Sequence, residues 1–179
     1  YYLFTSIENQ IFQNMIAQEL LNPKSIVVIG ASSDTQKPGG SVLKNLINSN
    51  FKGDIYTVNP KETEVQGIKC FQKVDDLPQV DCAIIAIAAK YCPATVNTLA
   101  FEKGTKGFII VSAGFSEENL EGAEFERQIV ETINKVGGSL IGPNCTGFLN
   151  RNYCGAFDSP IPTLDPHGVD FVTGSGATA

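Results

Sequence analysis

The chain has 179 residues and a net charge of −6, with 42% hydrophobic and 18% charged residues. This composition is that of a globular protein with room for one substantial core. The negative charge argues against broad contact with nucleic acid or an anionic membrane, and no apolar run is long enough to span a membrane. A bound anion must therefore be held by local amides and a few lysines.

The cysteine pattern argues against a disulfide framework and against a zinc site. Five cysteines are scattered along the chain without a C-x-x-C pair, and the sequence has a single histidine. We therefore expect no metal site and free, mostly buried thiols, as in a protein of the reducing cytoplasm. The cysteines are Cys70, Cys82, Cys92, Cys145 and Cys154.

Strand-like and helix-like segments alternate along most of the chain. Residues 1–14 precede the only methionine and are interpreted as an added or upstream segment; apolar residues near helical spacing predict a first helix ending at Leu21. The further elements, in chain order, are expected as strand 25–29, helix 40–49, strand 54–58, strand 82–88, helix 93–103, strand 107–111, helix 118–136 with Ser116 as N-cap, and strand 139–141. This alternation predicts an α/β fold with a doubly wound parallel sheet.

The loops that follow the expected strands are candidates for ligand contacts, because ligands of such sheets bind beyond the carboxyl ends of the strands. Each of the five loops is rich in Gly, Ser, Asn, Pro or Lys. They comprise residues 30–40, 59–61, 89–91, 112–116 and 142–150. We therefore expect them to converge on one edge of the sheet.

The first loop has the arrangement that directs backbone N–H groups at a phosphate. An apolar strand ends at Gly30, a short polar stretch follows, and the pair Gly39-Gly40 opens a helix. The dinucleotide fingerprint G-x-G-x-x-G is absent, because Ser32 stands where the second glycine is required. The sequence predicts a nucleotide-like anionic ligand whose phosphates are placed differently.

The second expected strand is followed by Asn59-Pro60-Lys61. Proteins that bind NAD carry an acidic residue near this point, which accepts hydrogen bonds from the ribose hydroxyls. Lys61 would instead attract a phosphate on the ribose, so the expected ligand is NADP or coenzyme A (CoA). These residues alone leave both ligands open.

Four motifs in series favour CoA. They are Gly30-Ala31-Ser32, Val58-Asn59-Pro60-Lys61, Ser112-Ala113-Gly114-Phe115 and Gly142-Pro143-Asn144-Cys145-x-Gly147. In order and spacing they resemble the N-terminal CoA-binding domain of ADP-forming acyl-CoA (acetyl-CoA) synthetases, which is related to the α subunit of succinyl-CoA synthetase. The resemblance runs from about Leu21 to the end of the chain.

This resemblance implies a domain organisation and a reaction. Residues 15–150 would form a Rossmann-like CoA-binding domain, 151–168 a linker, and 169–179 the truncated start of a second, flavodoxin-like domain of the succinyl-CoA synthetase type. The family interconverts acyl-CoA, ADP and phosphate with free acid, ATP and CoA, through an acyl phosphate and a phosphohistidine. ATP, ADP and Mg²⁺ would bind in other parts, such as an ATP-grasp domain or subunit.

The resemblance also implies roles for individual residues at the nucleotide end of CoA. Backbone amides and hydroxyls would cradle this end at Gly30, Ala31, Ser32 and Ser33. Asn59 would shape the second loop, and Lys61 would hold a phosphate.

At the other end, Ser112, Ala113 and Gly114 would line the path of the pantetheine arm, and Asn144 would face the centre where acyl and phosphoryl groups meet. Cys145 is interpreted as a packing residue, because the reacting thiol belongs to CoA. No catalytic residue is assigned, because the phosphohistidine is expected beyond Ala179 and His167 matches no motif position.

Two other functions fit the sequence less well. A stand-alone CoA-binding module would share the first loops, but it has no use for the apolar run and Gly-Ser-Gly sequence at 169–176. An NADP-dependent oxidoreductase domain is disfavoured by the missing fingerprint and by the lack of a residue suited to hydride transfer.

Overall fold

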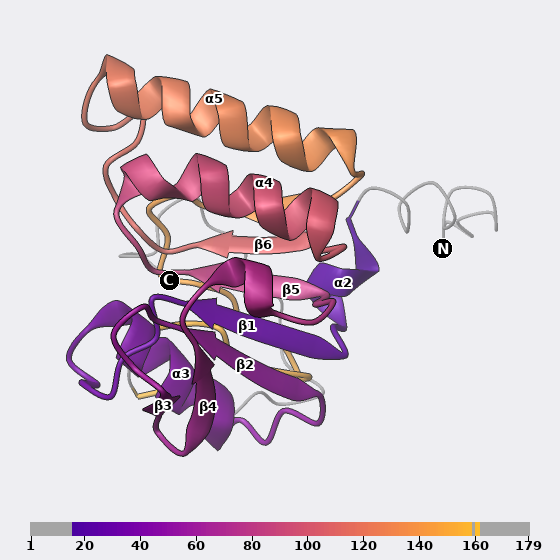
Figure 1. The fold of residues 1–179 in the computed structure, drawn as a ribbon, viewed down its shortest axis with the longest axis vertical. Helices are drawn as coiled ribbons and strands as arrows, with labels where there is room; N and C mark the ends of the chain where they lie inside the picture. Colours follow the sequence, from indigo (N-terminus) through magenta and orange to yellow (C-terminus); the bar gives the residue numbers. More distant parts are fainter. Residues whose placement is uncertain (1–15, 159, 162–179) are drawn as a thin grey trace, which may run out of the picture.

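A computed structural model describes residues 16–158, 160 and 161 of the chain. The described strands are β1 (Ser25–Ile29), β2 (Asp54–Val58), β3 (Glu64–Val65), β4 (Ile68–Phe71), β5 (Cys82–Ile85), β6 (Gly107–Ile110) and β7 (Ser139–Ile141). They form one sheet in the order β3-β4-β2-β1-β5-β6-β7, in which only the β3–β4 pair is antiparallel. Figure 1 shows β6, β5, β1 and β2 following one another across this sheet. The predicted doubly wound parallel sheet is confirmed.

Helices cover both faces of the sheet (Figure 1). The described α-helices are α2 (Gln18–Leu21), α3 (Pro38–Asn48), α4 (Cys92–Glu102) and α5 (Leu120–Lys135). Val27 and Ile29 of β1 belong to the core beneath α4 and α5, whereas Ile26 and Val28 belong to the core beneath α2 and α3. All five residues of β1 are buried, as expected for a central strand between two helical layers.

Most predicted elements lie where the sequence placed them. Strands 25–29, 54–58 and 139–141 have the predicted bounds, and strand 107–111 ends one residue early. The predicted strand 82–88 was wrong at its end, because β5 stops at Ile85. Both neighbouring strands end opposite Ile85, β1 at Ile29 and β6 at Ile110, and Gly30 turns the chain after β1 away with a φ of 82°. The residues after Ala86 therefore have no strand to pair with.

The start of α5 differs from the prediction. The helix begins at Leu120, two residues later than expected, and Ser116 is not its N-cap. Asn119 takes that role, since its side-chain oxygen accepts a hydrogen bond of 2.9 Å from the N–H of Gly122.

The short hairpin of β3 and β4 was not predicted. A two-residue turn, Gln66-Gly67, connects the strands, and both residues have positive φ values of 52° and 81°. The hairpin pairs with the end of β2 through the last two residues of β4, and Gln66 of its turn donates a hydrogen bond to the carbonyl of Ser32 in the loop that follows β1. The hairpin turn thus contacts one of the loops in which ligand-binding residues are expected.

Residues 149–158 pack against the face that carries α2 and α3. Tyr153 is 1% exposed, and its hydroxyl donates a hydrogen bond of 2.7 Å to the carbonyl of Leu20. Asn45 of α3 donates to the carbonyls of Ala156 and Asp158. The described part of the expected linker is therefore packed on the domain.

None of the described helices is long and apolar enough to cross a membrane. Most of the predicted first helix, the expected second domain at 169–179 and His167 lie outside the described residues.

Candidate functional site

The loops after β2, β1 and β5 meet at the carboxyl edge of the sheet. Asn59, after β2, donates a side-chain hydrogen bond of 2.8 Å to the carbonyl of Ala31, after β1. Gly30 approaches the segment after β5 so closely that a Cβ would collide with the carbonyl of Ala86 and lie 2.8 Å from Cγ2 of Ile87. Only glycine fits here, because the positive φ and the missing Cβ are both required.

The loops after β6 and β7 continue the same edge. A Cβ on Gly114, after β6, would lie 3.2 Å from Cβ of Ala89, which follows β5. The N–H of Asn144, after β7, donates a hydrogen bond of 2.9 Å to the carbonyl of Ser112. All five predicted loops therefore form one continuous edge.

Two backbone N–H groups in the first loop are available to a ligand. Among the described residues, the N–H groups of Ser32 and Ser33 have no hydrogen-bond acceptor. The carbonyls of the same two peptide units, those of Ala31 and Ser32, accept hydrogen bonds from Asn59 and Gln66. Because the C=O and N–H of a trans peptide point in opposite directions, these bonds direct both N–H groups away from Asn59 and Gln66. Adjacent free N–H groups are an anion-binding feature.

The N-terminus of α3 is packed against this loop. Pro38 occupies the first turn of α3, where its missing N–H costs nothing. A Cβ on Gly39 would collide with the carbonyl of Gly30, and one on Gly40 with the carbonyl of Asp34. This glycine pair therefore allows the close approach of helix and loop that the third glycine of G-x-G-x-x-G provides in dinucleotide-binding folds.

The second loop presents a lysine over a fixed turn. Asn59 accepts a hydrogen bond of 2.9 Å from the N–H of Lys61 while it donates to Ala31, so its side chain connects the two loops. Lys61 is exposed. Among the described residues its ammonium group has no ion-pair partner, so it is available to a ligand.

The loop after β6 carries a negative charge at its end, on Glu117. The N–H groups of Gly114 and Phe115 donate to the carboxylate of Glu117, at 2.7 and 3.2 Å. These hydrogen bonds, the one from Gly114 above all, hold the pKa of Glu117 below its ordinary value. The amide of Gly114 is therefore already satisfied, and the loop is suited to an uncharged part of a ligand.

The loop after β7 is shaped around a thiol. Cys145 donates a hydrogen bond of 3.4 Å to the carbonyl of Ile110, and burial raises the pKa of its thiol. A thiol kept protonated and bonded to a carbonyl is a poor nucleophile. Asn144 is exposed beside it with a φ of 53°.

The dimensions and charges of the edge fit an elongated ligand. From β2 to β7 there are four gaps between neighbouring strands, or roughly 19 Å at 4.8 Å for each gap. Lys61 stands near one end of this edge and Glu117 near the other. An elongated ligand with phosphates at one end and a neutral arm at the other matches this polarity.

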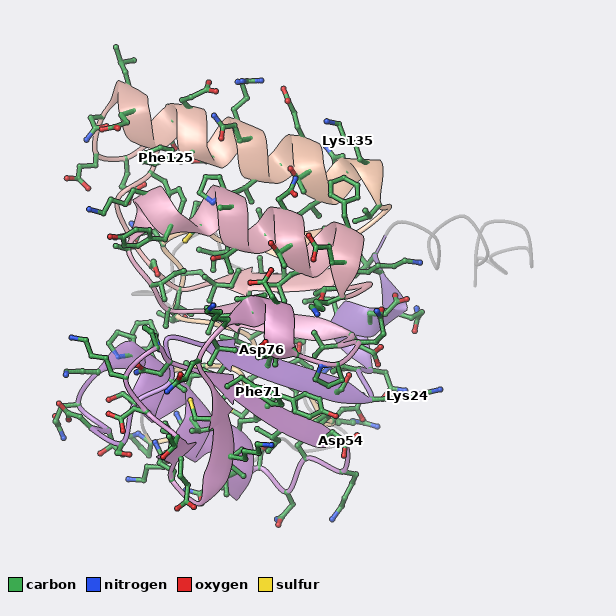
Figure 2. All side chains as sticks on the ribbon, in the orientation of Figure 1. Lys24, Asp54, Phe71, Asp76, Phe125 and Lys135 are labelled. Carbon is green, nitrogen blue, oxygen red and sulfur yellow. The ribbon has the colours of Figure 1, made fainter. Side chains whose placement is uncertain are left out.

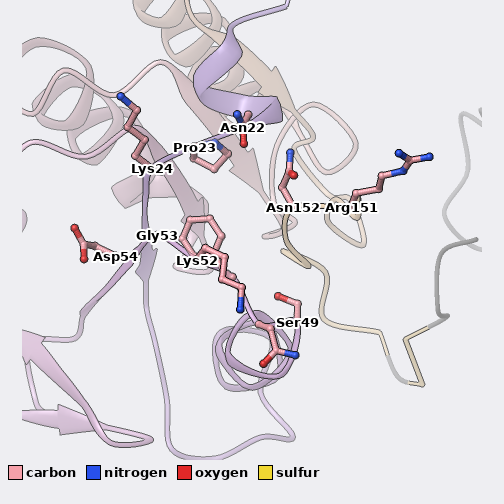
Figure 3. A pocket seen from close by; sticks show the side chains of 11 residues that line it. Asn22, Pro23, Lys24, Ser49, Lys52, Gly53, Asp54, Arg151 and Asn152 are labelled. Atoms are coloured by element: carbon pink, nitrogen blue, oxygen red, sulfur yellow. The ribbon is translucent and has the colours of Figure 1, made fainter. Parts of the chain in front are cut away.

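Two cavities lie apart from the predicted binding residues, although Lys90 of the loop after β5 lines one of them. One of about 660 Å³ is at the amino edge, where β1 and β2 begin beside the labelled Lys24 and Asp54 (Figure 2). Figure 3 shows the side chains of Lys24 and Arg151, two residues of its lining, diverging on either side of Asn22 and Pro23. The other, about 500 Å³, lies between α4 and α5 and includes Phe125. None of the predicted binding residues lines either cavity, and the described residues hold no cluster suited to a metal ion.

The sequence profile of the CoA binding domain matches residues 24–151. This stretch contains every predicted binding residue and all the loops of the carboxyl edge. The chain belongs to the CoA-binding domain family.

This CoA-binding domain is similar to parts of larger enzymes. It is 46% identical over 134 residues to the ADP-forming acetate–CoA ligase II of Archaeoglobus fulgidus, and 41% identical over 158 residues to the α subunit of the ADP-forming acetate–CoA ligase II of Pyrococcus furiosus. These matches cover 74% and 87% of this chain but 20% and 34% of the relatives.

A solved structure is similar in the same way. The acetyl-coenzyme A synthetase 1 of Ca. Korarchaeum cryptofilum, described as dinucleotide forming and solved with phosphate and ADP, superposes with a TM-score of 0.72 at 32% identity. The match covers 80% of this chain and 31% of that one. The CoA-binding domain thus spans about a fifth to a third of these relatives, and the resemblance seen in the sequence is confirmed.

The predicted residues of this CoA-binding domain fall into distinct structural settings. Ala31 is fully buried, so it offers a ligand only its backbone. The amide of Gly30 is occupied, since it donates to the carbonyl of Val58 at 2.9 Å. Sequence reasoning missed Gln66, whose signal was a Gln-Gly pair between two short runs containing valine, isoleucine and phenylalanine.

Proposed function

We propose that the chain binds CoA along the carboxyl edge, with the nucleotide on the loops after β1 and β2 and the pantetheine arm extending toward β6 and β7. The observation that carries this proposal is the pair of free N–H groups at Ser32 and Ser33, in a chain that belongs to the CoA-binding domain family. Backbone N–H groups beside a helix N-terminus stabilise a phosphate through hydrogen bonds and the helix dipole.

The nucleotide end is assigned to groups of three residues, Ser32, Ser33 and Lys61. The N–H groups of Ser32 and Ser33 bind phosphate oxygens, and the Ser32 hydroxyl, which accepts from the N–H of Asp34 at 3.1 Å, keeps its own hydrogen for donation. Lys61 binds the phosphate on the ribose. Gly30, Ala31 and Asn59 hold the loops in place and do not contact the ligand through their side chains.

The arm is assigned to the loops after β6 and β7. Ser112, Ala113 and Gly114 line its path, and Asn144 lies where its thiol end arrives. The carboxylate of Glu117 supports this direction, because it would repel phosphates but not the neutral pantetheine.

We further propose that this domain serves an ADP-forming acyl-CoA synthetase. The relatives named above are ligases of this type, and the domain spans only part of them. ATP, ADP and Mg²⁺ would bind in other domains or a partner subunit, which would also carry the phosphohistidine chemistry. The five free cysteines favour a reducing compartment such as the cytoplasm.

Isothermal titration calorimetry with CoA, dephospho-CoA and NADP tests the proposal. We expect CoA to bind most tightly, dephospho-CoA to bind more weakly because it lacks the phosphate assigned to Lys61, and NADP to bind weakest. Tighter binding of NADP would contradict the proposal and favour a dinucleotide-binding domain.

A further inference from the structure

Gln66 connects the hairpin of β3 and β4 to the first loop (residues 30–40), the candidate phosphate loop, through two hydrogen bonds. Its side-chain amide nitrogen lies 2.8 Å from the carbonyl oxygen of Ser32 and 2.9 Å from that of Gly40. Ser32 is in the loop after β1, and Gly40 is in the first turn of α3. A single side chain thus fixes the loop relative to the helix that follows it.

We infer that Gln66 is a positioning residue for CoA, one that directs the free N–H of Ser33 toward the ligand without touching the ligand itself. This inference rests on the proposed function. The carbonyl of Ser32 and the N–H of Ser33 belong to one peptide unit, so a donor that holds the carbonyl also fixes the direction of the N–H. Without Gln66 this peptide unit could rotate, and the phosphate would have to order it on binding.

The backbone of Gln66 supports a role for its side chain. Gln66 and Gly67 are the two central residues of a hairpin turn in which both φ values are positive, a turn that favours Asn, Asp or Gly at its first position. Glutamine is not among these residues. Asparagine would satisfy the turn better, but it is one methylene shorter, so its amide would fall short of the two carbonyls.

This difference separates a positioning role from a purely structural one. In Gln66→Asn we expect CoA to bind at least fivefold more weakly while the melting temperature stays within a few degrees or rises. Gln66→Gly should behave alike, because glycine also favours the turn. Gln66→Glu should lose at least as much affinity, because a carboxylate oxygen would face two carbonyl oxygens. The matched control is Gln72→Asn, which changes an exposed glutamine just after β4 and should leave binding unchanged.

Calorimetry with CoA is combined with the ¹H–¹⁵N heteronuclear NOE of Ser32 and Ser33 in the free protein. We expect lower NOE values in Gln66→Asn than in the wild type, confined to the first loop. Unchanged CoA affinity in Gln66→Asn and Gln66→Gly would overturn the inference and leave the proposed function intact. A wild-type chain that fails to bind CoA would overturn the proposed function. In that case the heteronuclear NOE would still test whether Gln66 orders the first loop, and equal NOE values in Gln66→Asn and the wild type would overturn this part of the inference as well.

Discussion

Asn59 and Ala31 join the two loops at the nucleotide end through one hydrogen bond of 2.8 Å, from the Asn59 side-chain amide to the Ala31 carbonyl. The same side chain accepts a hydrogen bond from the N–H of Lys61, so Asn59 positions both Lys61 and the first loop. A change at Asn59 should therefore disturb both halves of the site together.

Asn59→Ala tests that relationship. It removes the donor to Ala31, a buried residue, and the acceptor for Lys61. We expect a loss of about 1–2 kcal/mol in the free energy of unfolding, measured with urea, because a partly buried carbonyl is left unpaired. CoA affinity should fall by more than this loss of stability explains. Unaltered affinity in the folded fraction would mean that the two loops act independently.

Lys61→Ala tests the assignment of the ribose phosphate. Loss of one exposed charge-assisted contact should weaken CoA binding by about 1 kcal/mol, or about fivefold. Dephospho-CoA should bind equally well to the wild type and the variant, since it lacks the phosphate. The control is Lys52→Ala, an exposed lysine at the amino edge. An equal loss for both ligands would assign Lys61 to another phosphate of CoA.

Gly30→Ala tests the close contact between the loops after β1 and β5. A Cβ there would collide with the carbonyl of Ala86 on a backbone with positive φ. Gly137→Ala is the matched control, because Gly137 has a φ of 64° and open space around it. We expect the control to cost about 1 kcal/mol, from backbone strain alone, and Gly30→Ala to cost several times more. An equal loss in the free energy of unfolding for both variants, measured with urea, would show that the backbone at Ala86 can move to accommodate a Cβ on residue 30.

The buried thiols predict a pH dependence. Burial raises the pKa of both Cys82 and Cys92 to about 12. The pKa of a thiol in the unfolded chain is roughly 8.5. The buried, protonated thiols therefore contribute fully to the stability of the folded state below that pH, and this contribution is lost as the pH rises toward about 12. At pH 8, native Cys82 and Cys92 should react with a disulfide reagent at least 100-fold more slowly than in guanidinium. Rapid labelling of both residues in the native chain would contradict their burial.

The main strands and helices could be read from sequence because their patterns are strong. The run at 25–29 is apolar on both sides, as a central strand must be, and Pro38 with Gly39 and Gly40 marks the start of α3. The sheet and its carboxyl edge followed from that alternation. The family then followed from four loop motifs rather than from any one of them.

The missed features depend on tertiary contacts. The strands β3 and β4 have two and four residues, too few to show alternation, and their turn carries glutamine where asparagine is the usual signal. The early end of β5 depends on where its neighbour β1 ends, which no local pattern of β5 records. The two hydrogen bonds of the Gln66 side chain reach Gly40 and Ser32, which are 26 and 34 residues away in the sequence. Only the structure reveals them.

The central claim is that CoA lies along the carboxyl edge, and amide chemical shifts measured during a CoA titration test it most directly. We predict that the largest changes occur at Ser32 and Ser33, with further changes at Ser112, Gly114 and Asn144. The amides around the amino-edge cavity, Lys24 and residues 49–54, should stay unchanged. Changes confined to the amino edge, or to the groove between α4 and α5, would contradict the account.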